Sequence, residues 1–241
     1  MARQTAININ TIPIGPLGII GMPGCEELTD KIDKYLVKWR KTQAIEHAES
    51  IAFFGYQRDS YKIDITIPRF GSGEGKGVIN ESVRGYDIYI VCDVFNYSCT
   101  YNMYGKEVCM SPDDHFADLK RVISALCSKP KRVSVIMPML YEGRQHKRSS
   151  RESLDCAMAL KELVHLGVEN IITFDAHDQR VQNAIPDKSF ENVMPTYQMI
   201  KALVNNVDDL KVDKDHLMVI SPDEGALHRC IYFATQLGIN L

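Results

Sequence analysis

Two polar clusters in this chain carry side chains that could bind a metal ion or a phosphate. The sequence Asp-Ala-His-Asp at 175–178 follows the apolar run 168–174, and Ser-Pro-Asp-Glu-Gly-Ala at 221–226 follows the apolar run 217–220. Each run is short and β-branched, which predicts a buried strand. Ligands of open parallel sheets bind at the carboxyl ends of the strands, where both clusters would lie. A histidine and several carboxylates there indicate Mg²⁺ and a phosphorylated substrate.

Both clusters also have a purely structural explanation. His177 could be a satisfied structural residue, although its position at a strand end and the nearby carboxylates favour a binding role. Asp223 could cap the helix that is expected to follow it, since Pro222 precedes it. Gly225 and Ala226 could expose backbone N–H groups to a phosphate at the start of that helix.

A basic segment at 137–148 follows the predicted strand 132–138, so it is expected at the same edge of the sheet. Arg144 offers forked donors to phosphate and can stack on a base. Gln145 can hydrogen-bond the edge of an adenine. The alternative is that this segment is the solvated, basic start of a helix.

The glycine-rich segment 71–77 resembles a phosphate-binding loop only superficially. A Walker A motif needs glycine, four residues, then Gly-Lys-Ser/Thr, and Phe70 and Gly77 do not fit that spacing. The dinucleotide-binding fingerprint fails as well, because Lys76 stands three residues after Gly73. The simpler interpretation is a mobile hairpin turn.

The composition limits the classes of protein that need consideration. With 241 residues and 45% hydrophobic content, the chain can form one large domain or two small ones. A net charge of −3 gives no basic field for nucleic acid, and the lack of an 18-residue apolar run predicts no membrane span. The seven cysteines form no C-x-x-C pair, which favours free thiols in a reducing cytoplasm.

Alternating strands and helices predict an α/β fold in which helices flank a parallel sheet. The expected strands are 17–20, 50–54, 62–67, 86–93, 132–138, 169–174 and 216–221. The expected helices are 26–47, 113–128, 149–166, 178–184, 195–206 and 223–237. A boundary near Asp187 would divide the chain into domains at 1–186 and 187–241, the second of which is too short to close by itself.

Five blocks, in this order, resemble the ribose-phosphate pyrophosphokinases, also called phosphoribosyl pyrophosphate synthetases. The blocks are 69–85, 86–91, 135–145, 174–177 and 219–225. The resemblance implies two similar phosphoribosyltransferase-type (type I-like) α/β domains, of which the second would be incomplete here. It also implies assembly into homo-oligomers, either dimers or hexamers, in the cytoplasm.

The family's residue roles carry over where this sequence matches its motifs. Phe70 and Glu74 match positions that contact ATP from a neighbouring subunit, and Arg144 and Gln145 match ATP-binding positions. His177, the expected catalytic residue, and Asp223 match positions that bind Mg²⁺–ATP and ribose phosphate. The implied reaction transfers diphosphate from ATP to ribose 5-phosphate, with Mg²⁺ as cofactor, giving phosphoribosyl pyrophosphate and AMP.

The sequence also departs from the family pattern. Ser72 and His146 replace acidic residues, Ala226 replaces a glycine, and residues 40–66 resemble an insertion. The sequence reaches Leu241 before any segment like the family's basic catalytic loop or its ribose-phosphate loop. We therefore expect the first part of such an enzyme, inactive alone. One alternative is a non-catalytic regulatory or assembly homologue; another is a plain nucleotide-binding domain.

Overall fold

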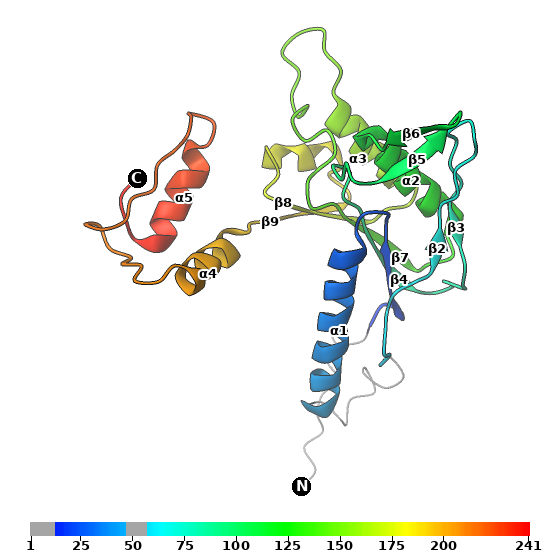
Figure 1. The fold of residues 1–241 in the computed structure, drawn as a ribbon, viewed down its shortest axis with the longest axis horizontal. Helices are drawn as coiled ribbons and strands as arrows, with labels where there is room; N and C mark the ends of the chain where they lie inside the picture. The colour runs from blue at the N-terminus through cyan, green and yellow to red at the C-terminus, as the bar shows by residue number, and fades with distance from the viewer. Residues whose placement is uncertain (1–12, 47–56) are drawn as a thin grey trace. The chain divides into compact units, whose positions relative to one another are not determined.

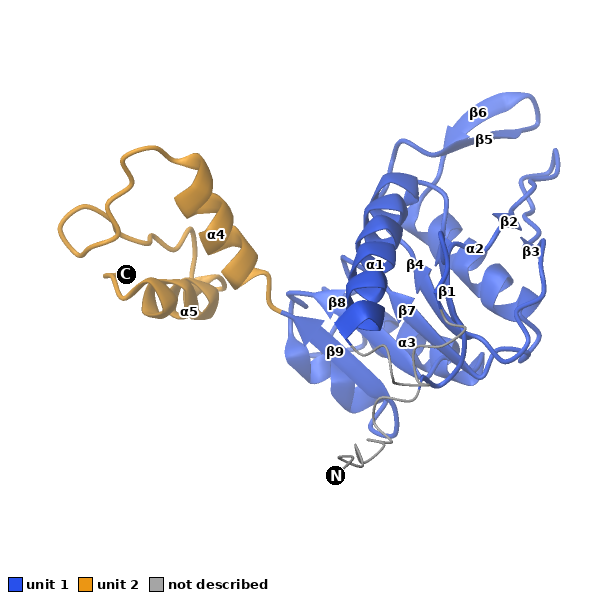
Figure 2. Ribbon diagram, turned by 90° about the horizontal axis from the view of Figure 1, so that it is seen from below, with its two compact units in different colours: residues 1–193 blue, residues 194–241 orange. Residues whose placement is uncertain are grey.

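The computed structural model describes residues 13–46 and 57–241. The chain divides into two compact units, residues 1–193 and 194–241, which are coloured separately in Figure 2. The strand expected at 50–54 lies outside the described residues. No helix in the described part of the chain is long and apolar enough to cross a membrane.

The first unit is built on a five-stranded sheet in which every neighbouring pair is parallel (Figure 1). In sheet order its strands are β1 (Leu17–Gly21), β4 (Asp87–Val91), β7 (Arg132–Ile136), β8 (Asn170–Phe174) and β9 (Ser189–Val193). The central strands are buried almost continuously, as expected for a sheet covered on both faces. The α/β fold class predicted from the sequence is thereby confirmed.

Helices cover both faces of this sheet because side chains alternate along each strand. On one face Ile19 and Val91 pack with apolar residues of α1 (Glu26–Glu46). On the other face lies the larger core, which includes Leu119 of α2 and Leu160 of α3. Figure 2 shows α1 in front of the sheet and the other two helices behind it. Those helices are α2 (Pro112–Ala125) and α3 (Asp155–His165).

Local sequence signals explain where α2 and α3 begin. Ser111 and Asp114 form a capping box at the start of α2, which is followed at once by a proline. The helix predicted from residue 149 begins only at Asp155. Upstream of it, the N–H of Ser149 and the hydroxyl of Ser150 donate to Glu152, and such side-chain bonds compete with helical ones.

Two antiparallel hairpins lie outside the main sheet. The first pairs β2 (Ile65–Thr66) with β3 (Val78–Ile79) and encloses the glycine-rich segment, which confirms the expected hairpin turn. The second pairs β5 (Thr100–Met103) with β6 (Lys106–Cys109) and was not predicted. The strand expected at 62–67 is reduced to β2 and an isolated bridge from Lys62 to β1.

The end of the first unit follows from the pairing of its last strand. After the 3-10 helix η2 (Gln179–Ala184), β9 pairs with β8 from Ser189 to Val193. The contacts therefore place these residues with the first unit and separate the units after Val193, whereas the sequence-based boundary lies near Asp187.

The second unit contains α4 (Thr196–Asn206) and α5 (Leu227–Leu237). Both helices were predicted, although α5 begins later than residue 223. The strand predicted at 216–221 is wrong, because its only pairing in the described structure is an isolated bridge from Met218 to Asn240. The apolar run is therefore not buried, and Ile220 is 78% exposed.

Candidate functional site

The candidate site begins where β7 and β8 end side by side. The N–H of Met137 donates to the carbonyl of Ile172 at 2.8 Å, and that of Phe174 donates to the carbonyl of Pro138 at 3.2 Å. The two loops that follow, 139–148 and 175–178, therefore start from adjacent points at the carboxyl edge. This is the edge at which open parallel sheets bind ligands, and both loops were singled out from the sequence.

Each loop contains a non-glycine residue with a left-handed backbone. Glu142 has a φ of 54° and Asp175 a φ of 44°. Such conformations are uncommon outside glycine and cluster at functional sites, where the surrounding structure holds them. The turn around Glu142 is closed by a hydrogen bond from the N–H of Gln145 to its carbonyl, at 2.8 Å. Burial raises the pKa of the Glu142 carboxyl above its usual range.

The turn leaves the two predicted nucleotide-binding side chains, Arg144 and Gln145, exposed to solvent. They share a cavity of about 450 Å³ with a further set of polar residues. Its lining residues are Arg144, Gln145, His146, Lys147, Ser149, Glu152 and Ser153. Because Arg144 and Lys147 contribute two positive charges against one carboxylate, the cavity favours an anionic ligand such as a phosphate.

His146 brings this cavity next to His177. The rings of the two histidines lie 5.0 Å apart between centroids, tilted by 39°. His177 itself is exposed, whereas the side chain of His146 is only 12% exposed. Three of the predicted site residues, Arg144, Gln145 and His177, thus lie near one another. His146, for which no role was predicted, lies between the cavity and His177.

Tyr141 belongs to the block 135–145 that resembles the family, but no role was predicted for it. Its hydroxyl donates to Asp113 at 2.6 Å, and its ring stacks on Phe116 with centroids 4.3 Å apart. Burial and the hydrogen bond to Asp113 both raise the pKa of Tyr141. Through these two contacts, the loop that carries Arg144 packs against α2. The position of Tyr141 after a strand and within the block 135–145 marked this segment, but neither signal indicated a contact with α2.

The donors near His177 bear on whether Mg²⁺ fits this site. Among residues 13–46 and 57–241, no group of three or more His, Cys, Asp or Glu side chains could hold a metal ion. Asp178 is already engaged by Arg180, whose guanidinium holds the pKa of that carboxyl well below its usual range. Mg²⁺ prefers oxygen ligands and often binds through one or two carboxylates plus substrate phosphates. The described side chains therefore supply no complete Mg²⁺ site by themselves, and an ion bound here would take most of its ligands from phosphate oxygens and water.

Asp223, the other predicted metal ligand, belongs to the second unit. Its Oδ1 accepts a hydrogen bond from the N–H of Ala226 at 2.8 Å, just before α5 begins. The carboxylate thus has the local, cap-like role that the sequence left open, although Ala226 and not Asp223 is the residue that precedes the helix. A magnesium ion bound by both His177 and Asp223 stays a prediction.

Phe70 and Glu74 lie on the β2–β3 hairpin, which Figure 1 shows beside α2. The N–H of Phe70 donates to the carbonyl of Glu74 at 2.8 Å, and the Phe70 side chain is 55% exposed. Ser72, which replaces an acidic family residue, donates to the Glu74 carboxylate at 2.7 Å. The hairpin therefore presents an aromatic ring and a carboxylate to solvent, as an intersubunit role requires.

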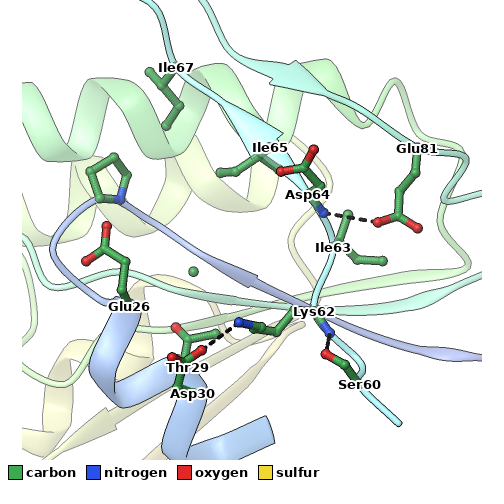
Figure 3. A pocket seen from close by; sticks show the side chains of 12 residues that line it. Glu26, Thr29, Asp30, Ser60, Lys62, Ile63, Asp64, Ile65, Ile67 and Glu81 are labelled. Carbon is green, nitrogen blue, oxygen red and sulfur yellow. Dashed lines mark hydrogen bonds and ion pairs between the residues drawn. The ribbon is translucent and has the colours of Figure 1, made fainter. Parts of the chain in front are cut away.

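A separate cavity of about 520 Å³ opens at the carboxyl end of β1 (Figure 3). It was not predicted. Its charged lining includes Glu26, Asp64 and Glu81, together with Asp30, which accepts a hydrogen bond from Lys62 at 2.6 Å. This bond lowers the pKa of Asp30. Since carboxylates outnumber the lysine, this cavity is a poorer place for a phosphate than the one beside Arg144.

Comparisons with known proteins identify the family that this chain resembles. A family model described as the N-terminal domain of ribose phosphate pyrophosphokinase matches residues 17–167. The ribose-phosphate pyrophosphokinase of Ralstonia nicotianae is 26% identical over 178 residues, covering 73% of this chain and 50% of the relative. That of Helicobacter pylori is 29% identical over 182 residues, covering 73% and 49%. The chain spans about half the length of the curated relatives it matches.

A solved structure supports the fold assignment. The crystal structure of phosphoribosylpyrophosphate synthetase from Mycobacterium smegmatis matches with a TM-score of 0.67 at 20% sequence identity. The match covers 92% of this chain and 61% of that one.

Proposed function

Because this chain belongs to the ribose-phosphate pyrophosphokinase family, we propose that it binds Mg²⁺–ATP at the loops that follow β7 and β8. The proposal places it in an enzyme that transfers diphosphate from ATP to ribose 5-phosphate. The observation that carries it is the cavity lined by Arg144, Gln145 and Lys147, with His177 next to it through His146.

In this proposal each side chain acts by positioning and charge. Arg144 offers two donors to a phosphate in a fixed fork, and Gln145 can pair with the edge of the adenine. His177 donates to a phosphate oxygen near the transferred group. Diphosphoryl transfer needs little covalent chemistry from the protein, so positioning and charge neutralisation are what these residues contribute. Mg²⁺, bound with the phosphates, neutralises part of their charge.

This chain spans about half the length of its curated relatives, so we propose the diphosphoryl transfer for a whole enzyme of that length. Residues 1–241 contain no segment that resembles the family's basic catalytic loop. The polypeptide 1–241 is therefore expected to bind the nucleotide without appreciable transfer. The free thiols of the seven cysteines are the reason for a proposed cytoplasmic location.

Titration calorimetry with Mg²⁺–ATP tests the nucleotide site. Arg144→Ala should weaken binding by about 1.5–3 kcal/mol, because it removes a charge-assisted hydrogen bond to phosphate. Arg148→Ala is the matched control: the same charge is removed from an exposed residue of the same segment that does not line the cavity. That variant should bind as the unmodified chain does.

Two results would contradict the proposal in different ways. Equal ATP affinity of the Arg144→Ala variant and the unmodified protein would show that the nucleotide lies elsewhere. No detectable ATP binding by the unmodified chain would favour the alternative of a regulatory or assembly homologue, a reading already suggested by His146 in place of an acidic family residue.

A further inference from the structure

We propose that His146 is a positioning residue: it holds the turn that carries Arg144 in a fixed position relative to the loop 175–178, which carries His177. The inference rests on the proposed nucleotide site and adds to it a residue specific to this chain. It explains how two loops that are separate in sequence are held in one relative position, so that Arg144 and His177 can act on the same ligand.

Between Arg144 and Arg148, His146 is the one residue that is not exposed. Arg144, Gln145, Lys147 and Arg148 are all exposed, whereas the His146 side chain is 12% exposed. A polar side chain that is mostly buried within a solvent-exposed turn generally has polar partners that offset its loss of hydration.

Both ring nitrogens of His146 face oxygen atoms. Its Nδ1 lies 3.2 Å from the carbonyl of Arg144, which can only accept, so that nitrogen donates. Its Nε2 lies 3.5 Å from Oδ2 of Asp178, a carboxylate whose side chain is 15% exposed; this is a close contact, and it becomes an ion pair when the ring carries both protons. One ring therefore contacts the turn that aims Arg144 and the residue that immediately follows His177.

The third contact is with His177 itself. The 5.0 Å separation of the two ring centroids places His146 against the imidazole that is proposed to reach phosphate. Asp178 is held from its other side by Arg180, so the carboxylate that His146 meets is fixed in place. Together these contacts restrict His177 without using its own polar atoms.

The same contacts explain why this position is a histidine. By its resemblance to the family, the expected residue is an aspartate, which here would direct a second carboxylate toward Asp178. Like charges at such short range disfavour each other, particularly where both are partly buried. His146 and Asp178 are thus a matched pair in this chain, and the natural family residue should perform worse here than a neutral one.

The experiment compares Mg²⁺–ATP affinity, by titration calorimetry on the full 241-residue chain, for three replacements of His146. His146→Gln keeps an N–H donor near the position of Nε2 and should retain most of the affinity. His146→Asn keeps a donor only toward the Arg144 carbonyl and should bind about tenfold more weakly, because the link to Asp178 is lost. His146→Asp should be the weakest binder. Arg148→Ala serves as the unaffected control.

A double-mutant cycle separates positioning from general stability. With His146 present, the losses caused by Arg144→Ala and His177→Ala should be non-additive, since the two side chains address one ligand. In the His146→Asn background the two losses should become additive. Thermal melts of every variant show whether each one is folded.

The outcomes are distinguishable. Equal ATP affinities for the glutamine and asparagine variants would overturn the role of His146. The same coupling energy between Arg144→Ala and His177→Ala in the His146→Asn background would overturn it too. Neither result would contradict the proposed ATP site. If the asparagine variant does not fold, a glutamine variant that folds but binds as weakly as His146→Asp overturns it as well. An unmodified chain that binds no ATP would overturn the proposed function and this inference with it.

Discussion

At the scale of single residues, Asp118 of α2 is a buried carboxylate that is held by two arginines. Its carboxylate is 2% exposed and accepts from Arg69 and from Arg121, each at 2.6 Å. The guanidinium of Arg69 also lies 4.5 Å from the ring centroid of Tyr101 and donates to the carbonyl of Gly73. One buried aspartate thus connects the loop that presents Phe70 to α2 and to the β5–β6 hairpin.

Replacing Asp118 by alanine should therefore be strongly destabilising. It leaves the partly buried guanidinium of Arg69 without its carboxylate, and removing one partner of a buried ion pair costs about 3–5 kcal/mol. Urea denaturation, monitored by circular dichroism, measures the change in the free energy of unfolding. Glu27→Gln breaks the solvent-exposed pair with Lys31 and should leave the midpoint unchanged. Equal midpoints for the Asp118→Ala variant and the unmodified chain would show that the network contributes nothing.

At the scale of elements, the β2–β3 hairpin lies directly against the backbone of α2. A Cβ atom at Gly77 would come within 2.8 Å of the carbonyl carbon and oxygen of Arg121. Backbone atoms cannot move away as a flexible side chain can. The glycine-rich segment is thus explained in part by packing: Gly77 permits close approach to the helix, and Gly73, with a φ of +92°, permits the turn.

Gly77→Ala should displace the hairpin from α2. The expected loss is about 1–3 kcal/mol of unfolding free energy, the usual cost of overpacking, with faster amide hydrogen exchange at Val78 and Ile79. Gly71→Ala is the control, because a Cβ there meets nothing within 4 Å and its φ is not in the left-handed region. Similar exchange rates in the two variants would mean that the hairpin accommodates the added methyl group.

At the scale of the whole molecule, the β2–β3 hairpin is the part of the chain that we expect to lie in the interface of a homo-oligomer. The family resemblance predicts that the loop 69–74 would complete the ATP site of a neighbouring subunit. Phe70 is exposed on this loop, which an ion pair between Arg69 and Asp118 connects to α2. An exposed aromatic ring on a rigid support is a typical anchor of an interface.

We predict at least a dimer in solution, measured by light scattering at several protein concentrations. Phe70→Ala should weaken the association by about 2 kcal/mol, roughly 30-fold in the dissociation constant, because buried aromatic anchors dominate interface energies. Tyr35→Ala removes another exposed aromatic ring, on α1, and should leave the association unchanged. A monomer at every concentration would contradict the prediction.

The sequence by itself determined the main parallel strands and the helices that cover them. The apolar, β-branched runs that became β1, β4, β7 and β8 can be buried on both faces only in a covered parallel sheet, so the local pattern and the fold agree. It also placed Arg144, Gln145 and His177 at strand ends, because parallel strands all finish at one edge of the sheet.

Only the tertiary structure decided the remaining features. The strand β9 and the β5–β6 hairpin have many exposed residues, and their pairing depends on hydrogen-bonding partners that no local pattern specifies. The run 216–221 had the apolar pattern but forms only an isolated bridge to Asn240 in the described structure, so it did not become a strand. In the same way, His146 meets Asp178 because β7 and β8 are neighbours in the sheet, and a contact between side chains so far apart in sequence exists only once the strands have paired.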